Sequence, residues 1–215
     1  MIACVLVYVW QHLLLSDEGA RQAADAFGLT PAALTGSAPL PSGVAVIPAW
    51  ATVLTSMFMH GGFWHLAGNM LYLWIFGNNI EDAMGHIRFL VFYLLCGVAA
   101  VAAQVLPNPG SILPMVGASG AISGVLGAYM LLYPRARVLL GLPLGFVIVE
   151  LGRYRAIWVL AAWFVLQLVI GNVAAQAAGA SAGGIAFGAH IGGFIAGCAL
   201  VTVFKRRGVS LWRRY

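Results

Sequence analysis

GASGAISGVLGAYMLLY, residues 117–133, is an apolar run that opens on a serine placed between glycines. Small residues that recur along an apolar run are typical of a helix that packs closely on its neighbours in a membrane. A histidine with similar glycine neighbours, His190, follows in a later apolar run. The sequence therefore predicts that much of the chain serves to hold a hydroxyl and an imidazole together inside a lipid bilayer.

Composition defines the broad class of the protein. Of the 215 residues, 62% are hydrophobic and 8% are charged, whereas a soluble domain has roughly 45–50% apolar and about 25% charged residues. An integral membrane protein is predicted, and spans of about 17–25 residues limit it to about five to seven helices in one bundle.

Charge and cysteine content exclude other classes. The net charge of +5 does not indicate nucleic-acid binding, because nearly all lysines and arginines lie at the ends of apolar runs, where membrane topology explains them. The three cysteines, Cys4, Cys96 and Cys198, lie inside apolar runs. That placement is typical of buried packing residues and not of a disulfide framework.

Six apolar runs suited to membrane helices follow one another along the chain. They cover about 1–15, 64–79, 88–106, 116–133, 156–170 and 185–204. The first run is short and a signal peptide is the alternative, but the lack of a basic segment and of a small-x-small cleavage site favours a span. The predicted fold is an all-α membrane protein, a six-transmembrane-helix bundle that forms a single domain over residues 1–215.

The connections between the predicted spans are recognised by residues that interrupt helices, chiefly proline and glycine. Residues 16–62 contain four prolines and scattered glycine and serine, so we expect an extramembrane outer loop that lies against the membrane surface. A polar turn is expected at Glu81-Asp82. Residues 138–152 are apolar but interrupted by glycine and proline, which predicts an interfacial connection, and residues 205–215 form a basic tail.

Basic residues lie mostly on one side of this predicted bundle. They are found between spans two and three, between spans four and five, and after span six: Arg88, Arg135, Arg137, Arg153, Arg155, Lys205, Arg206, Arg207, Arg213 and Arg214. The opposite side has only Arg21. The positive-inside rule then places both termini in the cytoplasm, and we expect the plasma or inner membrane.

Polar residues inside the spans converge at one depth. Spans two, four and six all enter from the outside, and their first turns contain His65 with Asn69, Ser119, and His190 respectively. Because residues four apart share a helix face, His65 and Asn69 point the same way. Polar side chains are costly in a membrane and mark functional sites, so these four residues form the candidate site.

The residue types indicate the chemistry. A serine hydroxyl becomes a nucleophile when a histidine takes its proton, so Ser119 and His190 predict acyl transfer. All six acidic residues lie outside the spans, so we expect a Ser-His dyad without a carboxylate, a metal or a cofactor. Candidates for stabilising the oxyanion are the Asn69 amide, the His65 imidazole and the Ser119 backbone N–H.

Each of these residues also has a purely structural interpretation. Glycine and serine pack membrane helices, and a histidine or an asparagine can bond a backbone carbonyl. Ser123 is a competing nucleophile on the same helix face, but it lies a turn deeper and lacks a glycine two residues before it. His60, next to Gly61-Gly62, is expected to be structural.

The motifs, taken in order, resemble the rhomboid family of intramembrane serine proteases. They are HLAGN at 65–69, EDAMG at 81–85, GASG at 117–120 and AHIGG at 189–193, followed by Gly197. The resemblance implies a rhomboid-type bundle with a nucleophile at Ser119, a general base at His190 and oxyanion stabilisation at His65 and Asn69. It also implies transmembrane protein substrates, cleaved within or near their transmembrane segments.

The chain departs from some family members at two places. Ser123 stands where an aromatic residue would stack on the catalytic histidine, and Ala51 follows Trp50 where an arginine would form a Trp-Arg pair. The main alternative function is a catalytically inactive rhomboid-like protein that binds transmembrane helices. A transporter is a further alternative, although the inner half of the spans offers no continuing polar path. The glycine-rich residues 179–184 are expected to act as a lid over the site.

Overall fold

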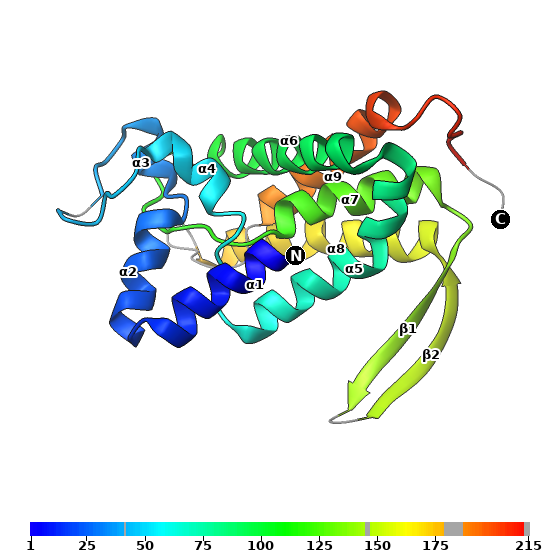
Figure 1. The fold of residues 1–215 in the computed structure, drawn as a ribbon, viewed down its shortest axis with the longest axis horizontal. Coiled ribbons are helices and arrows are strands. Elements are labelled where there is room, and N and C mark those ends of the chain that lie inside the picture. The colour runs from blue at the N-terminus through cyan, green and yellow to red at the C-terminus, as the bar shows by residue number, and fades with distance from the viewer. Residues whose placement is uncertain (41, 145–146, 179–186, 213–215) are drawn as a thin grey trace.

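The computed structural model describes residues 1–40, 42–144, 147–178 and 187–212, which form a helical bundle with one β-hairpin (Figure 1). The elements in chain order are α1 (Ile2–Val9), the π-helix η1 (Trp10–Leu14), α2 (Asp17–Phe27), α3 (Pro31–Thr35), the 3₁₀ helix η2 (Ala49–Ala51), α4 (Thr52–Thr55), α5 (Phe63–Met84), α6 (His86–Val105), α7 (Ser119–Leu132), β1 (Arg137–Leu144), β2 (Val147–Arg155), α8 (Ala156–Ala178) and α9 (Phe187–Phe204). Helices occupy all six ranges in which spans are predicted.

Membrane crossing is supported for part of this bundle. Within the described ranges, α6 and α9 are long and apolar enough to cross a membrane, whereas the apolar stretches of α1 with η1, of α7 and of α8 are shorter. The number of six spans therefore stays a prediction.

Two helix ends differ from the predicted ones, because each lies next to a glycine with a positive φ. α5 continues to Met84, so Glu81 and Asp82 belong to its last turn, and Gly85 makes the turn into α6 with a φ of 88°. α7 begins only at Ser119, because Gly117 has a φ of 128°, which lies outside helical geometry. Ser119 is therefore the first residue of its helix and does not lie a full turn inside it.

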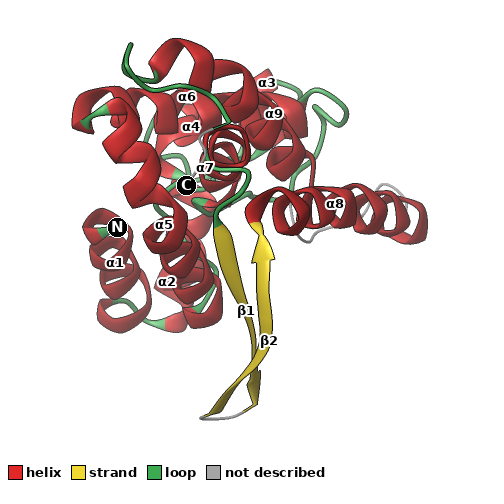
Figure 2. Cartoon of the chain, turned by 90° about the vertical axis from the view of Figure 1, so that its right-hand side faces the viewer, coloured by secondary structure: helices red, strands yellow, loops and turns green. Residues whose placement is uncertain are grey.

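Residues 137–144 and 147–155 form two antiparallel strands, so the expectation of an all-α chain is wrong here. The strands pair from Arg137 opposite Arg155 to Leu144 opposite Val147, with a register shift between Leu140 and Gly141. Glycine and proline prevent a helix in this segment, while its valines and isoleucine favour strands. Figure 2 shows the hairpin projecting from the helices, and β2 leads directly into α8.

The outer segment is folded against the start of α7. Leu29 and Met115 form an isolated antiparallel bridge, and the Thr55 hydroxyl donates to the Phe27 carbonyl over 2.6 Å. The Gly117 N–H donates to the Ser56 carbonyl over 2.9 Å. These bonds fix the residues immediately before Ser119, so the outer segment helps to position the start of α7.

α7 is the central helix, and glycines bring its neighbours close. Figure 2 shows it enclosed by the other helices, and nearly all of its residues are buried. A Cβ added at Gly193 or Gly197 of α9 would overlap the carbonyl oxygens of Gly120 or Gly124 of α7. The backbones of α7 and α9 are therefore in direct contact, which only glycine permits.

This contact predicts a large effect on stability. We expect Gly197→Ala to lower the free energy of unfolding by about 1–3 kcal/mol, because the methyl group forces apart two packed backbones. Gly68→Ala is the matched control, since a Cβ at Gly68 of α5 meets open space. Thermal unfolding in detergent measures both, and equal midpoints for the two variants would contradict the packing argument.

Candidate active site

Ser119 is held at the N-terminus of α7. The first N–H groups of a helix have no partner within it, so the Ser119 amide is free to bind a ligand. A Cβ at Gly117 would approach the His65 ring atoms Cε1 and Nε2 to 2.8 Å. Together with its positive φ, this contact explains why glycine occupies position 117.

Ser119 and His190 lie within hydrogen-bonding distance. The distance from Ser119 Oγ to His190 Nε2 is 2.8 Å, and both residues are half-buried. The contact between the glycines of α7 and α9 brings the two residues together across the helix interface. The pair has the geometry that a serine nucleophile and its general base require.

Three further side chains surround His190. Its Nδ1 lies 2.8 Å from Gln167 Oε1 of α8. The ring centroids of Trp163 and Phe187 lie 6.0 and 6.5 Å from that of His190. Aromatic residues thus approach the histidine from α8 and α9, although Ser123 replaces the aromatic expected on α7.

Gln167 and Trp163 are site residues that sequence reasoning missed. Gln167 did carry a signal, because it is an amide within the apolar run 156–170. Buried amides in a membrane find a partner, so such a residue points toward another polar group.

The Ser123 hydroxyl is bonded to the backbone of its own helix. Its hydroxyl donates to the Ser119 carbonyl over 2.7 Å, which is the usual bond of a helical serine to the residue four positions earlier. Its proton is thus directed at the helix backbone and away from His190.

His65 and Asn69 lie side by side on α5 near Ser119. The Gly61 N–H donates to His65 Nδ1 over 3.3 Å, so the neutral ring carries its proton on Nε2, the side that faces Gly117. The Asn69 amide donates to the His65 carbonyl over 2.8 Å. His65 therefore presents a donor toward the start of α7, while the Asn69 amide is bonded within its own helix.

These side chains line a cavity of about 270 Å³ between α5, α7, α8 and α9. Its lining residues are Trp64, His65, Gly68, Asn69, Tyr72, Ser119, Ile122, Ser123, Leu126, Trp163, Gln167 and His190. The structure thus gathers all four predicted site residues around one cavity. Much of its wall is apolar, because it includes the aromatic residues Trp64, Tyr72 and Trp163 and the aliphatic residues Ile122 and Leu126.

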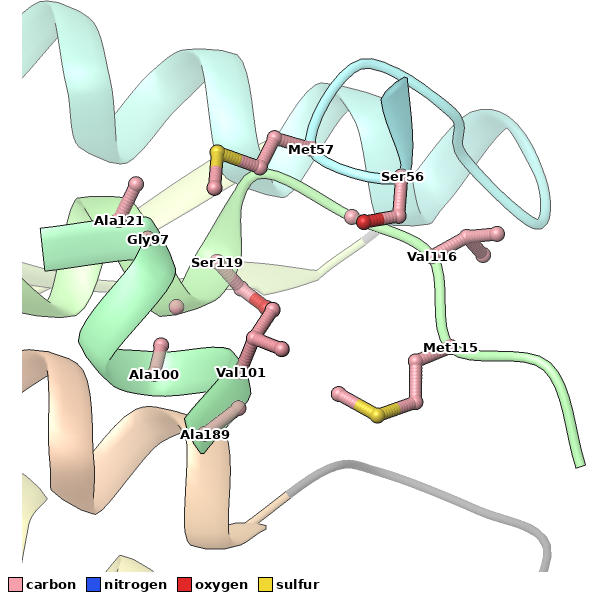
Figure 3. A pocket seen from close by; sticks show the side chains of 12 residues that line it. Ser56, Met57, Gly97, Ala100, Val101, Met115, Val116, Ser119, Ala121 and Ala189 are labelled. Carbon is pink, nitrogen blue, oxygen red and sulfur yellow. The ribbon is translucent and has the colours of Figure 1, made fainter. Parts of the chain in front are cut away.

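A second, smaller cavity also borders Ser119. It measures about 30 Å³ and is lined by residues of α6, α7 and α9, by residues 115–117 before α7, and by Ser56 and Met57 of the outer segment (Figure 3). A volume above roughly 10–15 Å³ holds a water molecule when polar partners are present. Ser119 therefore lies between a large cavity and a water-sized one.

His60, outside the helices, is buried beside this site. Its ring centroid lies 5.2 Å from that of His65, and its Nε2 has no hydrogen-bond partner within the described residues. Burial, with a smaller contribution from His65, lowers the pKa of His60 from 6.5 to about 4. The buried His60 ring is thus neutral near pH 7 in the folded protein.

The low pKa of His60 predicts acid sensitivity. Between pH 6.5 and about 4 the unfolded chain binds a proton that the folded protein does not, so stability should fall as the pH falls through this range. Thermal midpoints recorded across this range should show a slope that His60→Gln reduces. The control is His86→Gln, because the His86 side chain is 88% exposed; an equal slope in parent and His60→Gln would count against the prediction.

The expected lid at residues 179–184 lies outside the described residues.

Comparison with known proteins identifies relatives of this chain. A family model of the Rhomboid domain matches residues 48–207, a range that contains all four predicted site residues. Rhomboid protein 1, mitochondrial, of Saccharomyces cerevisiae is 37% identical over 93 residues, which cover 41% of this chain and 27% of the relative. Rhomboid protease GluP of Bacillus subtilis is 42% identical over 81 residues, covering 38% and 15% respectively.

A third relative is named as a rhomboid-like protein. Presenilin-associated rhomboid-like protein, mitochondrial, of Bos taurus is 35% identical over 88 residues, which cover 40% of this chain and 23% of the relative. The chain thus spans less than a third of the length of each of these three relatives.

Proposed function

Because the chain belongs to the rhomboid family, we propose that it is an intramembrane serine endopeptidase. The observation that carries this proposal is the 2.8 Å contact between Ser119 Oγ and His190 Nε2 beside a cavity of about 270 Å³. A nucleophile with its base, open to a space that admits a peptide, is the minimum that acyl transfer requires.

Acylation begins with proton transfer from Ser119 Oγ to His190 Nε2 as Oγ attacks the scissile carbonyl. The carbonyl oxygen becomes an oxyanion, and the Ser119 N–H and His65 Nε2–H are the donors placed nearest to it. His190 then gives the proton to the leaving amine, the C–N bond breaks, and an acyl-Ser119 ester remains.

Deacylation repeats these steps with water. His190 takes a proton from a water molecule, whose oxygen attacks the ester, and the proton then passes to Ser119 Oγ as the carboxylic acid product leaves. The cavity of about 30 Å³ beside Ser119 has room for such a water molecule next to the ester. The reaction requires no cofactor.

The proposed substrates are proteins anchored in the membrane by a helix. The cavity is bordered by α5 on one side and α8 on the other, and its wall carries Trp64, Tyr72 and Trp163. Aromatic and aliphatic walls suit an apolar segment that unwinds to present one peptide bond. This placement supports the proposal of cleavage within or near a transmembrane segment.

We place the end of the bundle opposite the outer segment in the cytoplasm. The Arg206 N–H donates to the Ala83 carbonyl, so the basic residues after α9 lie at the end of α5. The connection from α7 to α8 carries four more arginines, Arg135, Arg137, Arg153 and Arg155. The positive-inside rule assigns this end to the cytoplasm. Protease added to intact cells tests the assignment, because a cytoplasmic tail should be protected from it. Cleavage of the tail by protease added outside intact cells would reverse the assignment.

Covalent labelling tests the proposed function. A fluorophosphonate probe added to the detergent-purified protein should label it, and mass spectrometry should locate the adduct on Ser119. An inactive rhomboid-like protein that binds transmembrane helices is the alternative, and it would bind a transmembrane peptide without being labelled. Labelling that persists in Ser119→Ala, or absence of labelling in the parent, would overturn the proposal.

A further inference from the structure

Gln167 of α8 makes a polar contact with His190. It lies one turn after Trp163 on the same face of α8, and both residues line the large cavity. The neighbouring residues Val165, Leu166 and Leu168 are exposed on the surface of this apolar helix. An amide on such a helix is costly unless it is bonded, and Gln167 is bonded to His190 Nδ1 at 2.8 Å.

This bond determines which ring nitrogen carries the proton. A neutral imidazole has one N–H donor and one acceptor nitrogen. Because the Gln167 Oε1 atom can only accept, His190 Nδ1 must donate to it, and Nε2 is left with its lone pair toward Ser119 Oγ. A base that receives the serine proton needs this tautomer, since a protonated Nε2 could not accept it.

We propose that Gln167 is a positioning residue that holds His190 in the Nδ1–H tautomer with Nε2 facing Ser119; this inference rests on the proposed function. Trp163 and Phe187 limit the tilt of the ring, and Gln167 limits its rotation about the Cβ–Cγ bond. The three contacts together favour the orientation of the imidazole in which Nε2 meets the hydroxyl.

The same bond favours the transition state. When Nε2 takes the serine proton, the ring becomes cationic and the Nδ1–H bond to the Gln167 carbonyl becomes charge-assisted, which roughly doubles its strength. The stabilisation is larger for the imidazolium than for the neutral ring, so it accelerates the chemical step and not the binding of substrate.

An amide suits this place better than a carboxylate. An ionised carboxylate at this depth would have to be desolvated, and that cost is large in a membrane. The glutamine carbonyl offers an acceptor without a net charge. It thus supplies the orienting role of a third catalytic-site member in a chain whose six acidic residues all lie outside the predicted spans.

The decisive variant is Gln167→Met, which keeps the length of the side chain and removes its amide. We expect kcat for a transmembrane substrate to fall about tenfold with little change in KM, the effect of losing one hydrogen bond that strengthens in the transition state. Leu166→Met is the matched control on the same helix, because Leu166 is 51% exposed and does not line the cavity. It should retain parental kinetics.

Nitrogen NMR of the ¹⁵N-histidine-labelled protein provides a readout that does not depend on activity. The His190 signals, assigned by their loss in His190→Ala, should show the Nδ1–H tautomer in the parent and a mixture of tautomers in Gln167→Met. A parent with the proton on Nε2 would overturn the inference, even if the variant did not fold. Unchanged tautomer and kcat in a folded Gln167→Met would overturn it as well.

These outcomes separate the positioning role from the proposed function. A parent that cleaves no substrate and differs in nothing from Ser119→Ala refutes the protease, while the NMR tautomer still decides the role of Gln167. A parent that cleaves, with an inactive Ser119→Ala and a fully active Gln167→Met, refutes the inference alone.

Discussion

Ser119→Ala is expected to reduce cleavage of a transmembrane substrate by at least about 10⁴-fold, because it removes the hydroxyl that forms the acyl intermediate. Ser119 Oγ lies 2.8 Å from His190 Nε2, and its backbone N–H begins α7. The substitution removes the hydroxyl and leaves the glycine contacts between α7 and α9 unchanged. Turnover of a purified substrate reconstituted with the enzyme in lipid vesicles measures the effect.

Ser123→Ala is the matched control for this experiment. The two serines lie one turn apart on α7, but the Ser123 hydroxyl donates to the Ser119 carbonyl and not to the histidine. Loss of such a bond within a helix affects stability slightly and chemistry little. Equal activity of the two alanine variants would remove Ser119 from the role of nucleophile.

The placement of Ser119 near His190 could be foreseen from the chain. Apolar runs set the depth of each polar residue, and glycines on both helices indicated close packing. The structure adds the direct overlap that a Cβ at Gly193 or Gly197 would cause. Depth and side-chain size are properties of a single helix, so they can be predicted without knowledge of its partners.

The rotation of α8 could not be foreseen, and Gln167 was missed for that reason. Apart from Gln167, the run 156–170 is apolar, so its hydrophobic pattern alone does not indicate which face meets the bundle. Only the packing of α8 on α9 turns Trp163 and Gln167 toward His190.

The hairpin was missed for a different reason. Short apolar runs with glycine and proline fit a strand or an irregular interfacial segment equally well. The pairing of β1 with β2 is decided by contacts between two segments, and it cannot be read from either one. Similarly, the start of α7 depends on the positive φ of Gly117, which the packing of His65 against that residue explains.

His65→Phe is expected to lower kcat by about 10²-fold while KM changes little, the usual cost of removing one donor from an oxyanion site. Phenylalanine keeps a planar ring against Gly117 but has no N–H. The Gly61 N–H bond to His65 Nδ1 directs the Nε2 proton toward the start of α7, where the oxyanion forms. Steady-state kinetics on the same reconstituted substrate separate kcat from KM.

Asn69→Leu gives the comparison that makes this prediction specific. The Asn69 amide donates to the His65 carbonyl, so it must break that bond before it can reach an oxyanion. We therefore expect a smaller loss of kcat than in His65→Phe, since part of the gain in the transition state is offset by the broken bond. A larger loss in Asn69→Leu would show that Asn69 is the principal donor and that its amide turns toward the substrate on binding. Loss of covalent labelling in either variant, with thermal stability unchanged, would place that residue in the acylation step itself.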